Sequence, residues 1–131
     1  MQGSLAESAE LYGIERTREL DPKTRSSMGQ YMTPARVGRY IASLFTFADD
    51  SDSIMLLDPG AGVGSLTAAF VERLCLEGFK GALHVVAYEA EDILREALSH
   101  TLDSCRRQAE AAGFEMTEDV IAGDYIELAA N

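Results

Sequence analysis

Residues 53–67 read Ser-Ile-Met-Leu-Leu-Asp-Pro-Gly-Ala-Gly-Val-Gly-Ser-Leu-Thr, and this stretch decides the fold of the chain. The apolar run stops at Asp58, and a helical pattern begins after three glycines on alternate positions, Gly60, Gly62 and Gly64. This order predicts a strand, a tight turn and a helix, the arrangement with which α/β domains hold nucleotide-like ligands. We expect the glycines to let the backbone turn sharply and to let a ligand approach it without meeting a Cβ atom.

Two further strands are predicted downstream, each separated from the previous strand by a helix. The first of these helices covers 66–78 and leads into a strand over 82–88. A long helix with apolar residues on one side covers 93–113, and a third strand covers 114–122. Since crossovers between parallel strands are right-handed, the pattern predicts part of a doubly wound, Rossmann-like α/β fold, with a parallel sheet in strand order 3-2-1.

Two N-terminal helices are predicted ahead of the glycine stretch. The first covers 4–20 and is expected to be broken or loosened near Gly13, so residues 1–28 would form a helical arm and linker, and 29–131 the ligand-binding part. Thr33 is expected to cap the second helix and Pro34 to be its first residue. The spacing of its large apolar residues predicts one buried face, made of Val37, Tyr40, Ile41, Leu44 and Phe45.

The composition indicates one soluble domain. The chain has 131 residues, of which 47% are hydrophobic, and no apolar run approaches the roughly 20 residues of a membrane span. No secretory signal is visible at the N-terminus, so we expect a cytoplasmic protein without a membrane partner. Cys75 and Cys105 lack a metal-ligand spacing, which favours free thiols and predicts no metal site.

The charge excludes one class of function for this chain alone. Its formal net charge is −11, whereas a module that grips duplex DNA by itself is usually basic on one face. Any contact with nucleic acid would therefore come from a partner or from another part of the polypeptide.

An acidic residue stands at the end of each predicted strand: Asp58, Glu89 and Asp124. The carboxyl ends of parallel strands share one edge of the sheet, where ligands bind. Carboxylates there suit a ligand with an amino group, a ribose diol and an exocyclic amine, and they disfavour phosphates. The glycine stretch also lacks the lysine of a P-loop and the Gly-x-Gly-x-x-Gly spacing of dinucleotide sites.

Two motifs resemble those of a known enzyme family. Asp-Pro-Gly-Ala-Gly-Val-Gly (Asp58–Gly64) resembles the first S-adenosylmethionine motif of class I methyltransferases. Gly-Gln-Tyr-Met-Thr-Pro (Gly29–Pro34) resembles the N-terminal motif of adenine-specific DNA methyltransferases, and the order of the two is that of restriction–modification enzymes of this group. The resemblance covers roughly residues 21–130, and the pairing of the motifs is much more specific than the glycine motif alone.

The resemblance implies a role for each position of a cofactor site. Asp58 would hold the methionine amino group, directly or through water, and the backbone from Gly60 through Gly62 to Gly64 would pack against the cofactor. Its methionine carboxylate would lie near Thr33 and its neighbour Tyr31, and Glu89 would accept both ribose hydroxyls. The adenine would contact Ala90, donate its amino group to Asp124 and stack on Tyr125.

One departure from the family concerns catalysis. The catalytic motif of these enzymes is Asn/Asp-Pro-Pro-aromatic, which holds the target amine of a base flipped out of the duplex. The only prolines here are Pro22, Pro34 and Pro59, so no catalytic residue is expected in this chain. The chain would be the cofactor half of a methyltransferase acting on adenine N6, with DNA bound by the full-length protein.

Two alternatives stay open at this point. The chain could be a stand-alone S-adenosylmethionine-binding or interaction module, or part of a methyltransferase that acts on RNA, protein or small molecules. We also expect weak self-association, since the edge of the first strand would normally pair with a fourth strand that is absent here.

Overall fold

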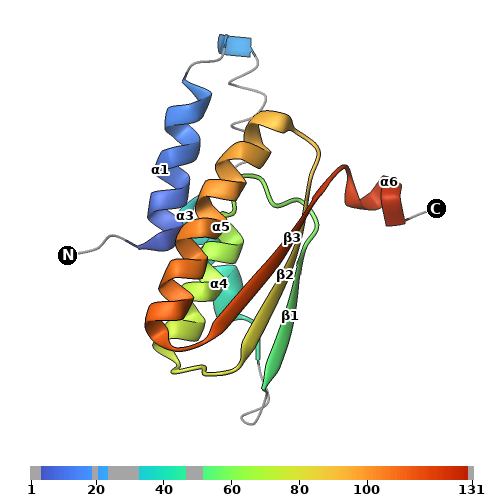
Figure 1. Ribbon diagram of the computed structural model, residues 1–131. Helices are drawn as coiled ribbons and strands as arrows, with labels where there is room; N and C mark the ends of the chain where they lie inside the picture. Colours follow the sequence, from blue (N-terminus) through green and yellow to red (C-terminus); the bar gives the residue numbers. More distant parts are fainter. Residues whose placement is uncertain (1–3, 19–20, 24–32, 47–51, 130–131) are drawn as a thin grey trace.

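The computed structural model describes residues 4–18, 21–23, 33–46 and 52–129, and Tyr31 therefore lies outside the described residues. A parallel three-stranded sheet in the order β1-β2-β3 carries its main helices on one side (Figure 1). The strands are β1 (Ser53–Asp58), β2 (Ala82–Glu89) and β3 (Glu115–Ala122). The helices are α1 (Leu5–Thr17), α3 (Ala35–Ser43), α4 (Ser65–Leu76), α5 (Asp92–Ala112) and α6 (Tyr125–Ala129). The predicted α/β fold and strand order are confirmed.

The core lies between the sheet and helices α4 and α5. Alternate residues of β2 are buried, as expected for a strand with helices on one face only. The buried side chains of the strands meet those of α4 and α5 in one cluster, which includes Leu83, Val85, Phe70, Leu98 and Leu102. The parallel register sets Asp58 beside Ala87 and Glu89 beside Ala122, so the carboxyl ends of the strands share one edge.

Helix α1 continues without interruption through Gly13, which corrects the predicted break. Gly13 is buried, and α1 packs on α4 and α5 with Leu5, Ala6 and Ala9 in the core. The Tyr12 ring stacks on His100 of α5 at a centroid distance of 4.0 Å. A glycine within a helix costs about 1 kcal/mol relative to alanine. The packing of α1 on α4 and α5 offsets this cost.

Helix α3 begins one residue later than the sequence predicts. Pro34 is its N-cap residue and Ala35 its first helical residue, so the expected Thr33 cap is wrong. The Ala35 N–H donates instead to Oε2 of Glu10, at 3.0 Å, from helix α1. Because a distant carboxylate satisfies this N–H, the helix begins without a local side-chain cap.

The fully buried residues of helix α3 are small ones, and not the large ones that the sequence predicts. Ala35, Gly38 and Ala42 are buried, whereas Tyr40 is 66% exposed and Leu44 62% exposed. Small residues let α3 approach α4 closely, and a Cβ atom on Gly38 would lie 3.4 Å from the Ser65 carbonyl oxygen. The predicted core-facing position is therefore wrong for Val37, Tyr40 and Leu44. Ile41 is half-buried, and the Phe45 ring packs edge to face on Phe70 of α4 with centroids 5.5 Å apart, so the prediction holds in part for these two residues.

One face and one edge of the sheet are open. Within the described ranges, β1 pairs with β2 alone, and Met55 on the face away from the helices is 74% exposed. Self-association through this edge stays a prediction, which light scattering at rising protein concentration tests. No helix among the described residues has the length and apolar character to cross a membrane.

Candidate functional site

The glycine loop after β1 is tied to the end of β2. The Ala61 N–H donates to the Tyr88 carbonyl oxygen at 2.9 Å, and the Gly62 N–H donates to Oε1 of Glu89 at 2.8 Å. A further bond, from the Gly64 N–H to the Ala61 carbonyl oxygen at 2.9 Å, closes the turn into α4. The loop therefore presents a defined backbone surface at the carboxyl edge of the sheet.

The three glycines of the loop differ in what surrounds them. A Cβ atom added to Gly60 or Gly62 would meet nothing within 4 Å, so the backbone at both positions is open. Gly64 has a φ of +88°, and a Cβ there would lie 2.9 Å from Cγ2 of Thr101 and 3.0 Å from Cδ1 of Leu98. The third glycine therefore lets the loop pack against α5, and the first two leave room for a ligand.

Asp58 lies beneath the loop and is only 4% exposed. Its Oδ2 accepts the Thr67 hydroxyl at 3.0 Å, which connects the end of β1 to α4. Burial raises the pKa of Asp58, although the hydrogen bonds from Thr67 and from the Gly60 backbone act in the opposite direction. In this structure the carboxylate supports the loop from inside.

The raised pKa makes stability depend on pH. Burial favours the protonated form of Asp58 in the folded state, so its contribution is complete below the unfolded-state pKa of about 3.9 and is lost as pH rises through the higher folded-state value. We expect Asp58→Asn, which cannot ionise, to gain stability relative to the unaltered protein as the pH rises above about 4. Urea unfolding at several pH values measures this difference.

The matched control for this experiment is Glu110→Gln, because Glu110 is an exposed carboxylate near the end of α5. Its stability difference from the unaltered protein should stay nearly constant over the same range. A constant difference for Asp58→Asn as well would contradict the buried-charge explanation.

Glu89 joins the loop to the start of α5. Its Oε2 accepts the Glu91 N–H at 2.9 Å, and its Oε1 accepts the Gly62 N–H. Each carboxylate oxygen has a second acceptor position, so the group retains capacity for a ligand hydroxyl. Arg95 holds the backbone here, because its Nη1 donates to the carbonyl oxygens of Glu89 at 2.8 Å and Ala90 at 2.7 Å.

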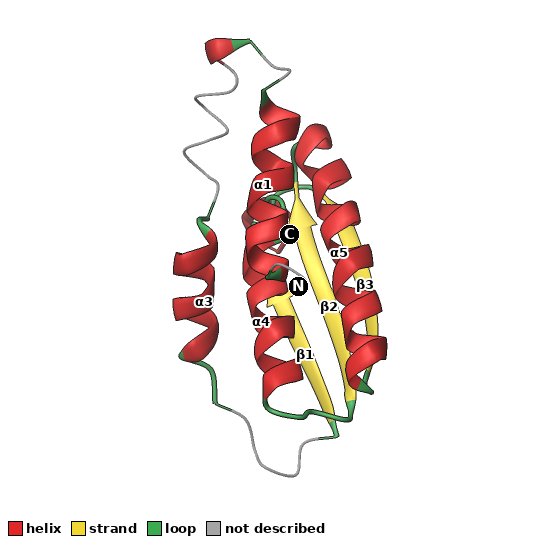
Figure 2. Cartoon of the chain, turned by 90° about the vertical axis from the view of Figure 1, so that its left-hand side faces the viewer, coloured by secondary structure: helices red, strands yellow, loops and turns green. Residues whose placement is uncertain are grey.

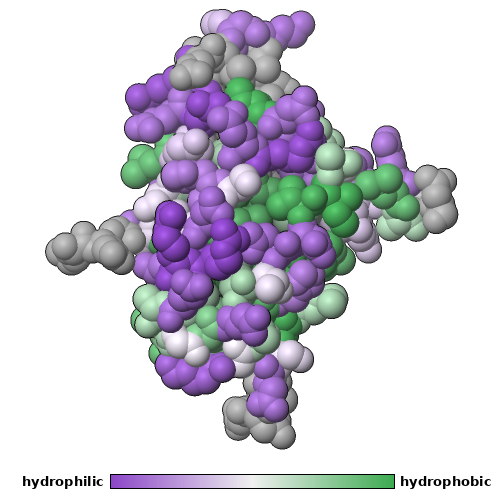
Figure 3. All heavy atoms as spheres, in the orientation of Figure 1, coloured by the Kyte–Doolittle hydropathy of each residue, from purple (hydrophilic) through white to green (hydrophobic). Residues whose placement is uncertain are grey.

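Asp124 and Tyr125, which follow β3, form a further wall of the site. Oδ1 of Asp124 accepts the Ile126 N–H at 2.8 Å and thereby caps the start of α6. The Tyr125 ring meets that of Tyr88 edge to face, with centroids 5.1 Å apart. Figure 3 shows apolar side chains gathered where α6 leaves the sheet.

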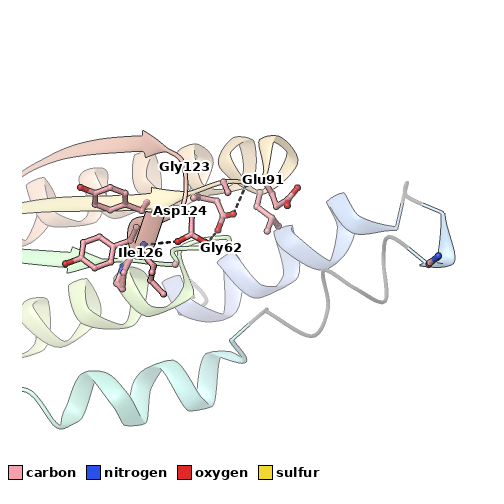
Figure 4. Close-up of a pocket in the computed structure, with 13 residues that line it drawn as sticks. Gly62, Glu91, Gly123, Asp124 and Ile126 are labelled. Atoms are coloured by element: carbon pink, nitrogen blue, oxygen red, sulfur yellow. Dashed lines mark hydrogen bonds between the residues drawn. The ribbon is translucent and has the colours of Figure 1, made fainter. Parts of the chain in front are cut away.

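These groups surround a cavity of about 830 Å³ at the carboxyl edge of the sheet (Figure 4). Six of the predicted site residues line it: Gly60, Gly62, Glu89, Ala90, Asp124 and Tyr125. Three others do not, namely Thr33, Asp58 and Gly64. The sequence prediction did not include the remaining lining residues, Lys23, Pro59, Tyr88, Glu91, Leu94, Gly123 and Ile126.

The missed residues carried different sequence signals. Glu91 and Gly123 stand within two residues of predicted ones, so the neighbourhood of each strand end could have identified them. Leu94 matches the apolar pattern of α5, and this pattern by itself indicates a core position. Arg95 and Lys23 gave no signal, since nothing local connects either one to a strand end.

The cavity combines acidic groups with apolar walls. The residues that line it include three acidic ones, Glu89, Glu91 and Asp124, and one basic one, Lys23. This balance disfavours polyanionic ligands and favours a ligand with hydroxyl, amine or cationic groups. Leu94 and Ile126 add apolar surface suited to a flat ring.

Comparison with known proteins gives two similar sequences. The chain is 35% identical over 109 residues to the Type II methyltransferase M.PstI of Providencia stuartii, covering 82% of this chain and 21% of that protein. It is 37% identical over 109 residues to the Type II methyltransferase M.BsuBI of Bacillus subtilis, covering 82% and 20%. The chain thus spans about a fifth of the length of these relatives. No family model matches it, and no solved structure gives a significant match.

Proposed function

We propose that this chain is the S-adenosylmethionine-binding portion of a class I, adenine-specific (N6) DNA methyltransferase of a restriction–modification system. The observation that carries the proposal is that Glu89 and Asp124 meet the open glycine loop around one cavity. Similarity to two Type II methyltransferases supports the same reaction class. The resemblance of Gly29–Pro34 to an adenine-enzyme motif supports the N6 position.

The residues of the cavity fit S-adenosylmethionine. The volume of about 830 Å³ lies within the range of cofactor sites, and the open Cβ positions at Gly60 and Gly62 leave the loop backbone accessible. Phosphate-bearing ligands would meet three carboxylates, whereas this cofactor carries ammonium and sulfonium charges. When bound, S-adenosylmethionine supplies an activated methyl group.

Each wall of the cavity would hold one part of this cofactor. Glu89 would accept the ribose hydroxyls, with its backbone held in position by Arg95. Ala90, Asp124 and Tyr125 would hold the adenine, the aspartate as acceptor and the tyrosine as an aromatic wall. Asp58 is buried and does not line the cavity. It would therefore act on the methionine amino group through a water molecule or through the loop that it supports.

Catalysis and DNA contact would come from the rest of such an enzyme. The Asn/Asp-Pro-Pro-aromatic motif is absent from the sequence, and the net charge of −11 suits neither phosphate contact nor groove binding by this chain alone. The proposed enzyme would act in the cytoplasm, where its DNA substrate lies.

Isothermal titration calorimetry of the chain with S-adenosylmethionine tests the proposal. We expect one binding site, and no binding of ATP at the same concentrations because its phosphates would meet the carboxylates of the cavity. Circular dichroism checks that the sample is folded. A folded sample that binds ATP, or that gives no heat with S-adenosylmethionine, would contradict the proposed function.

A further inference from the structure

Tyr88 lies on the face of the sheet that the main helices leave open. On the other face, Leu83, Val85 and Ala87 of the same strand are buried in the core cluster with side chains of α4 and α5. Successive side chains of a strand point to opposite faces of the sheet, so the half-buried Tyr88 points away from that cluster. Figure 2 shows α1, α4 and α5 together on one face of the sheet, and the Tyr88 ring lies on the face away from them.

Helix α6 also lies away from the main helices. Figure 1 shows it at the end of β3, separated by the sheet from α4 and α5. No residue of α6 is buried, and Ile126 is 76% and Leu128 47% exposed. Tyr125, the first residue of the helix, is half-buried, whereas residues 126–129 are all exposed. Burial within α6 is therefore concentrated at Tyr125.

Tyr88 contacts both α6 and the glycine loop. Its ring meets the Tyr125 ring edge to face, with centroids 5.1 Å apart and planes at 74°. In this geometry the positive edge of one ring meets the negative face of the other. The Tyr88 carbonyl oxygen accepts the Ala61 N–H of the loop at 2.9 Å. One residue of the central strand thus joins two of the segments that line the cavity.

We propose that Tyr88 is a positioning residue, which holds α6 to the sheet and thereby fixes the Tyr125 ring as a wall for the adenine. This inference rests on the proposed function, which assigns the adenine to Tyr125. Asp124 does not fix that ring, because its Oδ1 accepts the N–H groups of Ile126 and Glu127 within the same turn. Those bonds shape the start of α6, whereas the aromatic pair joins α6 to β2.

The aromatic pair would act on affinity through the order of the Tyr125 side chain. Ordering a side chain at the moment of binding lowers affinity. With the Tyr88 ring as a partner, Tyr125 is ordered before the cofactor arrives. Loss of the Tyr88 ring would move this ordering to the binding step, so that affinity falls although Tyr125 itself is unchanged.

Tyr88→Thr tests this dependence, because threonine keeps the strand propensity of the position but has no ring. We expect it to weaken S-adenosylmethionine binding by about 3–10-fold in calorimetric titration, the contribution of one aromatic pair. Tyr88→Phe retains the ring and should bind within about twofold of the unaltered chain. Tyr40→Thr is the matched control, because Tyr40 of α3 is 66% exposed and does not line the cavity. It should leave the affinity unchanged.

Two further measurements separate positioning from direct contact with the cofactor. If Tyr88 acts through Tyr125, adding Tyr88→Thr to a Tyr125→Leu chain should cause no further loss of affinity. In the chain without ligand, the Cα chemical shifts of residues 125–129 should lose their helical values in Tyr88→Thr and keep them in Tyr88→Phe.

The positioning role is overturned if Tyr88→Thr leaves the affinity or the helical shifts of α6 unchanged. It is also overturned if Tyr88→Thr weakens binding as much in the Tyr125→Leu chain as in the unaltered one, since Tyr88 would then contact the cofactor directly. A Tyr88→Thr chain that fails to fold would make Tyr88 a core residue and would overturn it too. A folded, unaltered chain that binds no S-adenosylmethionine contradicts the proposed cofactor site, and the shifts measured without ligand still decide whether Tyr88 holds α6.

Discussion

Gly64→Ala is expected to lower the free energy of unfolding by about 2–5 kcal/mol, a large share of the stability of a domain of this size. A left-handed conformation costs a residue with a Cβ atom roughly 1–2 kcal/mol, and Gly64 has a φ of +88°. The new methyl group would also lie 2.9 Å from Thr101 and 3.0 Å from Leu98, and overpacking of this kind costs about 1–3 kcal/mol. Urea unfolding followed by circular dichroism measures the loss.

Gly60→Ala is the matched control, because a Cβ atom at that position would meet nothing within 4 Å. We expect its free energy of unfolding to stay within about 0.5 kcal/mol of the unaltered protein. Its affinity for S-adenosylmethionine should fall, since Gly60 lines the cavity. Equal destabilisation by the two variants would show that the loop does not pack as described.

Glu89→Gln is expected to weaken S-adenosylmethionine binding by about 10–100-fold. Hydrogen bonds to a charged acceptor contribute about 1.5–3 kcal/mol, against about 0.5–1.5 kcal/mol for neutral pairs, and this carboxylate would accept two hydroxyls. The amide oxygen of glutamine can still accept the Gly62 N–H. The Glu91 N–H, which the amide nitrogen cannot accept, lies in an exposed contact where water can replace the lost oxygen, so the fold should survive. Calorimetric titration of both proteins gives the ratio of dissociation constants.

Glu110→Gln removes one negative charge far along α5 and should leave this affinity unchanged. The comparison separates a specific acceptor from a general effect of charge on a cationic ligand. If Glu89→Gln bound S-adenosylmethionine as tightly as the unaltered chain, Glu89 would not be the ribose acceptor.

Local sequence signals were sufficient for the architecture. The apolar run ending at Asp58, the alternate glycines and the helix after them predict strand, turn and helix because each signal acts over a few residues. Repeating that unit twice sets the strand order, since parallel crossovers have one hand. The acids Glu89 and Asp124 could be located for the same reason, as each directly follows or lies close to a strand end.

Local sequence signals could not predict which residues of α3 are buried. Its large residues have the spacing of a core-facing stripe, yet Gly38 and Ala42 face α4 because only small side chains permit that close approach. The helix start moved from Thr33 because Glu10, distant in sequence, supplies the hydrogen-bond acceptor. Both outcomes depend on which surface a neighbouring helix offers, and helix periodicity holds no information about that neighbour.

The same distinction applies within the glycine loop. The sequence alone established a glycine turn followed by a helix and placed acidic residues near the same sheet edge. Tertiary structure decided that Gly64 packs against α5 while Gly60 and Gly62 face the cavity, and that Asp58 lies buried on Thr67. Chain neighbours determine backbone conformation, but only the contacts between distant segments decide which loop atoms remain accessible to a ligand.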